Sequence, residues 1–376
     1  MKTAQLVVNQ RENSDLDFNI NPQLILAFGE RKFLENSDSV KNVRSKYPSA
    51  IIAGCTTSGE ITGERVIDDS LVLTAIEFEK TNIELAEAVL NGSENPSFDA
   101  GKNLATGLPS HNLKHVLVFS DGLNVNGTDL VRGMSSSLPS GVTVTGGLAG
   151  DGPNFLKTYT IDNNGDLKSN TITAIGLYGD NINVGFASRG GWDSFGVDRT
   201  VTRSKGNVLY EIDGEPALDL YKSFLGDKAK ELPASGLLFP LSMRDKEDVE
   251  PVVRTILGIS EEDKSLTFAG DIPEGSFVRL MKANSDRLIN GAEEAAETIM
   301  DGPSNNVDLA ILVSCVGRKL VLKQLVEEEV EVVSDVLGKP TITGFYSYGE
   351  LAPFGFLQNQ CELHNQTMTI TTLSES

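Results

Sequence analysis

The strongest constraint on the fold is a plan that occurs three times along the chain: an apolar run, a helical pattern, and a second apolar run ending in glycines and an acid. The copies fall at residues 24–60, 115–151 and 308–350. In the last copy Val326, Val330 and Val333 recur at helical spacing, and the acids among them are expected to face water. Each copy therefore predicts two parallel strands joined by a helical crossover.

Between the copies, apolar segments predict antiparallel strands. Residues 71–78 and 83–89 are expected to form one hairpin, and residues 170–178 and 182–187 another. The fold class predicted is mixed α/β: two domains with βαβ repeat units and added antiparallel strands. A chain of 376 residues exceeds what one core usually supports, and glycine-rich breaks favour a boundary near residue 205.

Charge and hydropathy exclude several classes of partner. The net charge is −21, from 53 acidic and 32 basic residues, so a nucleic acid or an anionic membrane surface would repel the chain. No run approaches the roughly 20 apolar residues that span a bilayer, so we expect no membrane insertion. The first 21 residues contain no apolar secretory segment, and we expect a cytoplasmic protein.

The ends of the three copies contain the candidate site. Glycines after a strand allow sharp turns, and ligands of open α/β sheets bind beyond the carboxyl ends of strands. Glu60, Asp151 and Glu350 are therefore predicted to face a shared or equivalent cleft and to bind the amino group of a small ligand. The alternative is that each is a solvated or helix-capping turn residue. No P-loop and no G-x-G-x-x-G motif opens a helix, so a nucleotide site is not expected.

Cysteine chemistry gives a weaker hypothesis. The odd count and wide spacing of Cys55, Cys315 and Cys361 argue against a disulfide framework and a structural zinc site. Cys55 and Cys315 end predicted strands, where a cysteine is usually a small buried apolar residue. Arg318 and Lys319 would lower the pKa of the Cys315 thiol if they lay close to it. No complete catalytic set accompanies either thiol, so we predict that the chain is not an enzyme.

The histidines differ in context. His111 and His115 lie four residues apart in a predicted loop and are expected to be solvated. His364 lies in an alternating run, on the same strand face as Gln366. Both side chains need polar partners if that face is buried. His364 is then either a structural histidine or a contact to a ligand or metal.

At these segments the chain resembles the FIST family, a two-part sensory module of bacterial signalling proteins and of some eukaryotic F-box proteins. The signs are residues 54–60, 145–151, 345–353 and 363–369. The resemblance implies a FIST N-like domain at residues 20–205 and a FIST C-like domain at residues 206–373. The motif residues supply the predicted ligand-binding set: Cys55, Thr56, Gly59, Glu60, Gly147, Asp151, Tyr346, Tyr348, Glu350, His364, Asn365 and Gln366.

The resemblance also implies a function. Members are proposed to sense small ligands, amino acids among them, and a stand-alone chain would signal in trans. Members of the NosP type bind haem, sense nitric oxide and modulate a histidine kinase. Haem b, with His364 as axial ligand, and a sensor histidine kinase are therefore the most specific cofactor and partner predicted. The sequence has no C-x-x-C-H motif, so a haem would be held non-covalently. A haem-free sensor of an amino-acid-like ligand and a thiol-dependent enzyme are the alternatives.

Overall fold

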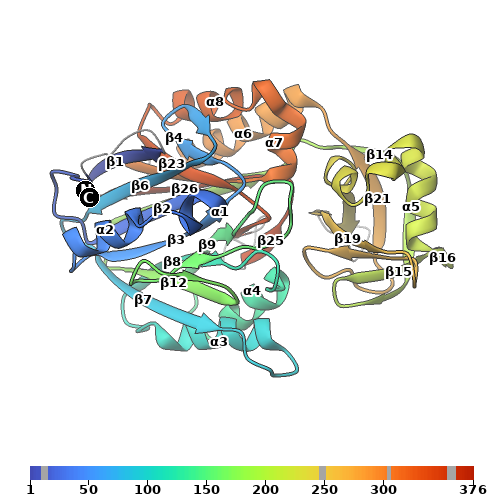
Figure 1. The fold of residues 1–376 in the computed structure, drawn as a ribbon, viewed down its shortest axis with the longest axis horizontal. Coiled ribbons are helices and arrows are strands. Elements are labelled where there is room, and N and C mark those ends of the chain that lie inside the picture. Colours follow the sequence, from blue (N-terminus) through green and yellow to red (C-terminus); the bar gives the residue numbers. More distant parts are fainter. Residues whose placement is uncertain (10–15, 245–250, 303–305, 354–360) are drawn as a thin grey trace.

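The chain forms a main body of three six-stranded sheets and a separate side lobe, residues 193–282 (Figure 1). The computed structural model describes residues 1–9, 16–244, 251–302, 306–353 and 361–376. The main body and the lobe lie side by side, and the two chain ends lie together on the main body (Figure 1). The Met1 amino group is 3.4 Å from a carboxylate oxygen of Glu375.

The three sheets share one strand plan. In each, the third and fourth strands form a parallel pair and all other neighbours are antiparallel. The first sheet runs β1 (Lys2–Asn9), β6 (Ser70–Glu77), β2 (Leu24–Glu30), β3 (Ile51–Thr57), β10 (Thr160–Ile161) and β11 (Leu167–Lys168). The second runs β7 (Asn82–Val89), β12 (Thr171–Tyr178), β8 (Leu113–Ser120), β9 (Thr143–Leu148), β24 (Gly349–Pro353) and β25 (Cys361–His364). The third runs β13 (Ile182–Arg189), β26 (Met368–Glu375), β22 (Leu309–Cys315), β23 (Thr341–Ser347), β4 (Glu60–Thr62) and β5 (Arg65–Ile67). The parallel pairs and the mixed α/β class predicted from the sequence are confirmed.

The sheets exchange strands in a cycle. β4 and β5 follow β3 in the chain but complete the third sheet, whereas β24 and β25 follow β23 and complete the second. β10 and β11 follow β9 and complete the first sheet. At the opposite edges, β6 and β7 belong to different sheets, as do β12 and β13. The two hairpins expected from the sequence are therefore wrong, because each short connection crosses from one sheet to the next.

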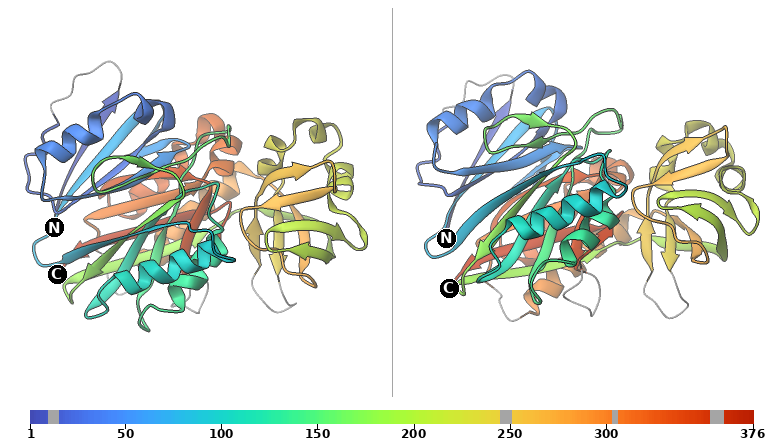
Figure 2. Two further views of the ribbon diagram at one scale, coloured as in Figure 1. Left: turned by 60° about the horizontal axis from the view of Figure 1, so that its bottom comes forward. Right: turned by 90° about the horizontal axis from the view of Figure 1, so that it is seen from below.

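Helices cover the outer face of every sheet, as the second sheet shows most clearly (Figure 2). The first sheet packs on α1 (Arg31–Glu35) and α2 (Ser39–Lys46), and the second on α3 (Pro96–Gly107) and α4 (Gly127–Ser135). The third packs on α6 (Ser285–Met300) and α8 (Glu328–Val336), while α7 (Val316–Leu322) and the short helix η3 (Lys323–Leu325) follow β22. No helix among the described residues is long and apolar enough to cross a membrane.

The inner faces of the sheets meet in a shared apolar core. Phe28 of the first sheet lies 5.3 Å from Phe119 of the second and 4.8 Å from Phe345 of the third, between ring centroids. The remaining pair of rings is 6.2 Å apart. All three side chains are fully buried. The three copies therefore fold around one common centre.

One glycine per copy lets the parallel strands approach. Gly54, Gly146 and Gly344 occupy equivalent places in β3, β9 and β23. A Cβ at these positions would lie 1.8, 1.9 and 1.9 Å from a carbonyl oxygen of the neighbouring strand. A larger residue would push the strands apart, so the repeated glycine is a packing requirement.

The side lobe is an eight-stranded sheet with one main helix, α5 (Ala217–Leu225), and its own apolar core. Its strands are β14 (Asp193–Lys205), β15 (Val208–Ile212), β16 (Glu215–Pro216), β17 (Leu241–Arg244), β18 (Val252–Arg254), β19 (Ile256–Ser260), β20 (Ser265–Phe268) and β21 (Phe277–Lys282). Short helices η1 (Gly226–Glu231) and η2 (Ala234–Leu238) follow α5. The boundary predicted near residue 205 falls at the end of β14, inside this lobe, and residues from 285 onward belong to the main body.

Candidate functional site

The three copies are joined at the carboxyl ends of their second parallel strands by a ring of backbone hydrogen bonds. The bonds occupy equivalent positions in the copies: Ser58 N–H to Tyr346 O at 2.8 Å, Gly150 N–H to Thr56 O at 2.9 Å, and Tyr348 N–H to Leu148 O at 3.1 Å. Each copy donates one bond and accepts one. We call this arrangement the strand-end ring.

A cavity of about 520 Å³ lies beside the strand-end ring. It is lined from the end of β2, from α1, α7 and η3, from the loops that follow β3 and β9, and from the turn before β6. The lining residues are Glu30, Lys32, Thr57, Ser58, Gly59, Asp68, Asp69, Asp151, Gly152, Pro153, Asn154, Val316, Lys319, Leu320 and Lys323. Four acids and three lysines thus surround one space, which we call the ring cavity.

Opposite charges are paired on its walls. The Arg31 Nε donates to Asp151 at 2.8 Å, and Asp151 is almost fully buried. Lys319 Nζ donates to the backbone oxygen of Ser58 at 2.9 Å and forms an ion pair with Asp68. The cavity can therefore offer a cation and a carboxylate to one small ligand.

Two buried carboxyl groups lie close to the ring but do not line the cavity. Glu60 accepts hydrogen bonds from Thr57 and Ser70, and Glu350 accepts them from Ser347 and from the backbone of Thr367. Burial raises the pKa of each carboxyl to about 8. At neutral pH both are therefore mostly protonated and neutral, and neither receives a ligand's amino group directly.

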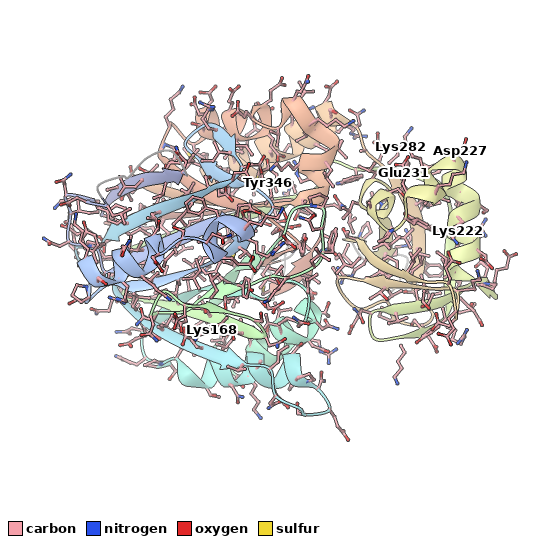
Figure 3. All side chains as sticks on the ribbon, viewed as in Figure 1. Lys168, Lys222, Asp227, Glu231, Lys282 and Tyr346 are labelled. Carbon is pink, nitrogen blue, oxygen red and sulfur yellow. The ribbon has the colours of Figure 1, made fainter. Side chains whose placement is uncertain are left out.

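Beneath the cavity, α7 begins with a buried ion pair. Arg318 donates to Glu329 at 2.8 Å, and both side chains are fully buried. The Tyr346 hydroxyl also donates to Glu329, and burial raises the pKa of that phenol. Figure 3 places Tyr346 within the main body, close to α7. The expectation that every acid of α8 faces water is wrong for Glu329, because Arg318 pairs with it.

Of the twelve residues that the sequence nominated, Gly59 and Asp151 line the ring cavity. A Cβ on Gly59, whose φ is +131°, would lie 2.3 Å from Lys319 Nζ, so this glycine gives the lysine its space. Tyr348 is adjacent, since its hydroxyl donates to Gly152 O at 2.9 Å and its ring stacks on Phe155 at 4.3 Å.

Other nominated residues lie inside the body. Cys55 and Gly147 face the shared core, where a Cβ on Gly147 would lie 2.5 Å from a methyl of Val313. Thr56 is buried and its hydroxyl accepts a hydrogen bond from the Tyr159 N–H at 3.0 Å. The ring of Tyr346 lies below Lys319 Nζ, 5.6 Å from the ring centroid. None of these four nominated residues lines the ring cavity.

Asn365 and Gln366 join the main body to the side lobe. Gln366 Nε2 donates to Leu237 O at 3.0 Å, and Asn365 Oδ1 accepts from the N–H of Thr255 at 3.3 Å. The Trp192 indole donates to Gln366 O at 2.9 Å. This segment therefore holds the two units together, away from the ring cavity.

His364 is enclosed between strands. Its Nε2 bonds Ala352 O at 3.1 Å, it lies opposite Glu350 in the β24–β25 pair, and burial lowers its pKa to about 4. It lines neither the ring cavity nor the cavity in the side lobe. With that ring nitrogen engaged, a haem iron could bind it only after the bond to Ala352 O is broken.

The remaining histidine and thiol expectations are corrected. His115 lies in β8, not in a loop, and is buried between the hydroxyls of Thr143 and Thr145. Burial lowers its pKa to about 3. Burial also raises the pKa of the Cys315 thiol well above its usual value, although Arg318 opposes this shift. No cluster of three or more potential metal ligands occurs among the described residues.

Sequence reasoning missed Arg31, Asp68 and Lys319 as residues of the site. The sequence indicates Lys319 only as a neighbour of Cys315, but its side chain lines the cavity. Its position one turn after the end of β22 was the available signal, because the first turn of a helix after a strand borders the carboxyl edge of the sheet. No sequence pattern near Arg31 indicates that it pairs with Asp151, which lies 120 residues away.

Comparisons with known proteins match this chain along most of its length. Residues 23–215 match the model of the FIST N domain, and residues 217–353 that of the FIST C domain. An uncharacterized protein of Methanocaldococcus jannaschii is 24% identical over 356 residues, covering 86% of this chain. The alignment spans 65% of that longer protein.

Solved structures give a weaker likeness. A cyanuric acid hydrolase from A. caulinodans matches 99% of both chains at 7% identity, with a TM-score of 0.37. A second cyanuric acid hydrolase structure covers 100% of this chain and 99% of its own, at 9% identity and a TM-score of 0.28. TM-scores this low support no conclusion about fold or activity.

Proposed function

Because the chain belongs to the FIST family, whose domains are signal-transduction sensor domains, we propose that it binds a small ligand in the ring cavity and signals in trans. The observation that carries this proposal is a cavity of about 520 Å³, lined by charges of both signs, beside the strand-end ring that joins all three copies. Cavities of roughly 300–1,000 Å³ hold small metabolites in proteins.

The charges favour an amino-acid-like ligand. A ligand carboxylate is expected to bind near Lys319, and its ammonium group near Asp151. Both side chains already have partners, Asp68 and Arg31, so the ligand binds by exchanging these ion pairs. Charged groups in partly buried positions interact more strongly than in water, which favours a zwitterion over a neutral molecule of the same size.

A route for the signal begins at α7. Lys319 lines the cavity, while the adjacent Arg318 donates to the backbone oxygens of Gly190 and Leu288. Gly190 precedes the first lobe strand, and Leu288 follows the last one in the first turns of α6. A displacement of α7 by a ligand would therefore act on both connections to the side lobe. The lobe would then change its position and present a different surface to the partner.

Binding is tested by calorimetry with a panel of free amino acids. Replacing Lys319→Met removes a charged hydrogen-bond donor and is expected to weaken the best ligand about 10–100-fold, equivalent to about 1.5–3 kcal/mol. Lys228→Met is the matched control, because Lys228 is an exposed side-lobe lysine paired with Glu231. Equal affinities of the two variants, or no binding by any member of the panel, would refute the proposed site.

The narrower hypothesis is a haem-based nitric oxide sensor that modulates a histidine kinase. It requires His364 to break its bond to Ala352 and a porphyrin space to open beside it. Addition of haemin, followed by the absorption spectrum, tests it. A Soret band that is lost in His364→Ala and kept in His111→Ala would support haem binding through His364. An unchanged band in His364→Ala would exclude His364 as the axial ligand.

The thiol-dependent enzyme receives no support from the described geometry. Burial raises the pKa of Cys55 and of Cys315, which disfavours the reactive thiolate. Measuring the rate of alkylation by a small iodoacetamide probe in the native protein tests this point. Fast labelling of either thiol at neutral pH would reopen the hypothesis.

A further inference from the structure

The side lobe contains a second cavity, of about 180 Å³, that nothing in the proposed function uses. It reaches the lobe's core, since Ile212, Tyr221 and Leu241 belong to that core and line it. Its remaining lining residues are Phe195, Gly196, Val197, Arg199, Phe224, Val278, Arg279 and Leu280. We call it the lobe cavity.

Its rim exposes apolar side chains to water. Val197 is 68% exposed, Phe195 40% and Phe224 38%. These three residues come from β14 and α5 and border one opening. Exposed apolar residues that gather around a concave space, rather than scattering, mark a binding site for an apolar group.

A bulge in β14 forms part of this wall. The register of β14 with β21 shifts between Phe195 and Arg199, and Gly196 within the bulge has a φ of +83°. Asp198 fixes the bulge by accepting from Arg279 Nε at 2.7 Å and by pairing with Arg244. These ion pairs hold the bulged strand in place beside the cavity.

The two guanidinium groups on the wall are already neutralised. Arg279 pairs with Asp198, and Arg199 pairs with Asp213 at 3.0 Å. Arg199 also lies over the Phe224 ring, 5.2 Å from its centroid. The Tyr221 hydroxyl donates to Phe239 O at 2.7 Å. The polar groups around the cavity therefore have partners, and an anionic ligand would have to displace one.

From these observations we infer that the lobe cavity is a binding site for a small, uncharged aromatic molecule. Its volume exceeds the roughly 150 Å³ of an engineered protein cavity that binds benzene. A small aromatic molecule therefore fits this space beside the exposed apolar rim. The site is separate from the ring cavity, so the inference does not depend on the proposed function.

The test uses the full chain and three small aromatic probes: the uncharged indole and benzyl alcohol, and the anion benzoate. Indole and benzyl alcohol are expected to raise the Tm with increasing concentration, because they bind the native state only. Benzoate is expected to bind at least about tenfold more weakly by calorimetry, since its charge loses hydration without gaining a free cation. Tighter binding of benzoate would overturn the uncharged class.

Two substitutions separate this site from non-specific binding. Val197→Ser removes apolar surface at the rim and is expected to weaken indole about fivefold. Val89→Ser is its matched control, because Val89 is 66% exposed on β7 of the main body and should leave indole affinity unchanged. Leu241→Phe fills the cavity and should abolish binding. The inference would be overturned if none of the aromatic probes bound. It would also be overturned if indole bound with the same affinity to the wild type, Val197→Ser and Leu241→Phe.

Discussion

The ring cavity and the lobe cavity differ in how the chain builds them. The ring cavity lies where three copies of one structural plan end, and acids and lysines line it. The lobe cavity lies in a sheet that the plan does not include, and mainly apolar side chains line it. The three repeats place their strand ends together, and polar loops and helix N-termini follow those strand ends in the chain. A single bulge in a non-repeated sheet instead opens a path into an apolar core.

The same contrast holds for what stabilises the two units. The main body contains a fully buried ion pair, Arg318–Glu329, whereas the lobe's Arg279–Asp198 pair is partly exposed. Buried charges depend strongly on their partners, and exposed charges do so only weakly. The comparison can be broken or sharpened by three sets of variants.

The largest effect is expected for Arg318→Met. It leaves Glu329 buried without its cation and removes the donor to Gly190 and Leu288, so the free energy of unfolding should fall by about 3–5 kcal/mol. Arg279→Met in the lobe should cost only about 0–1 kcal/mol. Urea denaturation of both variants measures the difference. Similar losses would mean that the two units do not differ in this respect.

A pH dependence follows from Glu60 and Glu350, whose folded pKa of about 8 lies above the unfolded value of 4.5. Their protonation stabilises the fold fully below about pH 4.5, and this contribution is lost as the pH rises to about 8. Stability falls over this range because the unfolded state releases these protons at a lower pH than the folded state does.

In the lobe, Asp198 has the opposite sign. Its hydrogen bond from Arg279 lowers the pKa of the carboxyl, so its contribution to stability is present above pH 3.8 and is lost as the pH falls through the lowered value.

The free energy of unfolding, measured from pH 4 to 9, should fall with rising pH in the wild type and change less in the double variant Glu60→Gln/Glu350→Gln. The slope should persist in Asp198→Asn. An unchanged slope in the double variant would contradict the assignment.

The smallest effect separates two strand glycines. In Gly344→Ala the new methyl group would lie 1.9 Å from Leu312 O, so overpacking should cost about 1–3 kcal/mol. In the lobe, Gly258→Ala meets nothing closer than 3.8 Å and should be neutral or stabilising by up to about 1 kcal/mol. Thermal melts of both variants decide the matter, and a destabilised Gly258→Ala would show that the lobe is packed more tightly than its contacts suggest.

Local pattern explains what the sequence predicted well. Apolar runs flanking a helical period identify β2–β3, β8–β9 and β22–β23, because a βαβ crossover is contained within one short stretch of chain. No local sequence pattern indicates which strands pair when they are distant in the chain. The alternation of β6 and β7 is the same whether they pair with each other or, as here, join different sheets. The wrong hairpins come from that ambiguity.

The site shows the same limit. The sequence identifies Asp151 because glycines mark a strand end. It does not identify Lys319 as a cavity residue, because its neighbours in space, Ser58 and Asp68, lie about 250 residues away in sequence. Glu329 was expected in water because helical periodicity assigns a face but cannot identify a buried partner. Pairings of charge over long separations depend on the tertiary fold, and no local spacing encodes them.

The side lobe leaves the main body through neighbouring strands. Asp193, at the start of β14, lies directly opposite Lys282, at the end of β21. Entry and exit are therefore adjacent, and the lobe can in principle be exchanged for a short loop without moving β13 or α6. Such modularity would let the strand-end ring keep its geometry while the lobe diversifies. A chain shortened in this way would also lose the lobe's bonds to the main body, among them those of Gln366 to Leu237 and of Asn365 to Thr255.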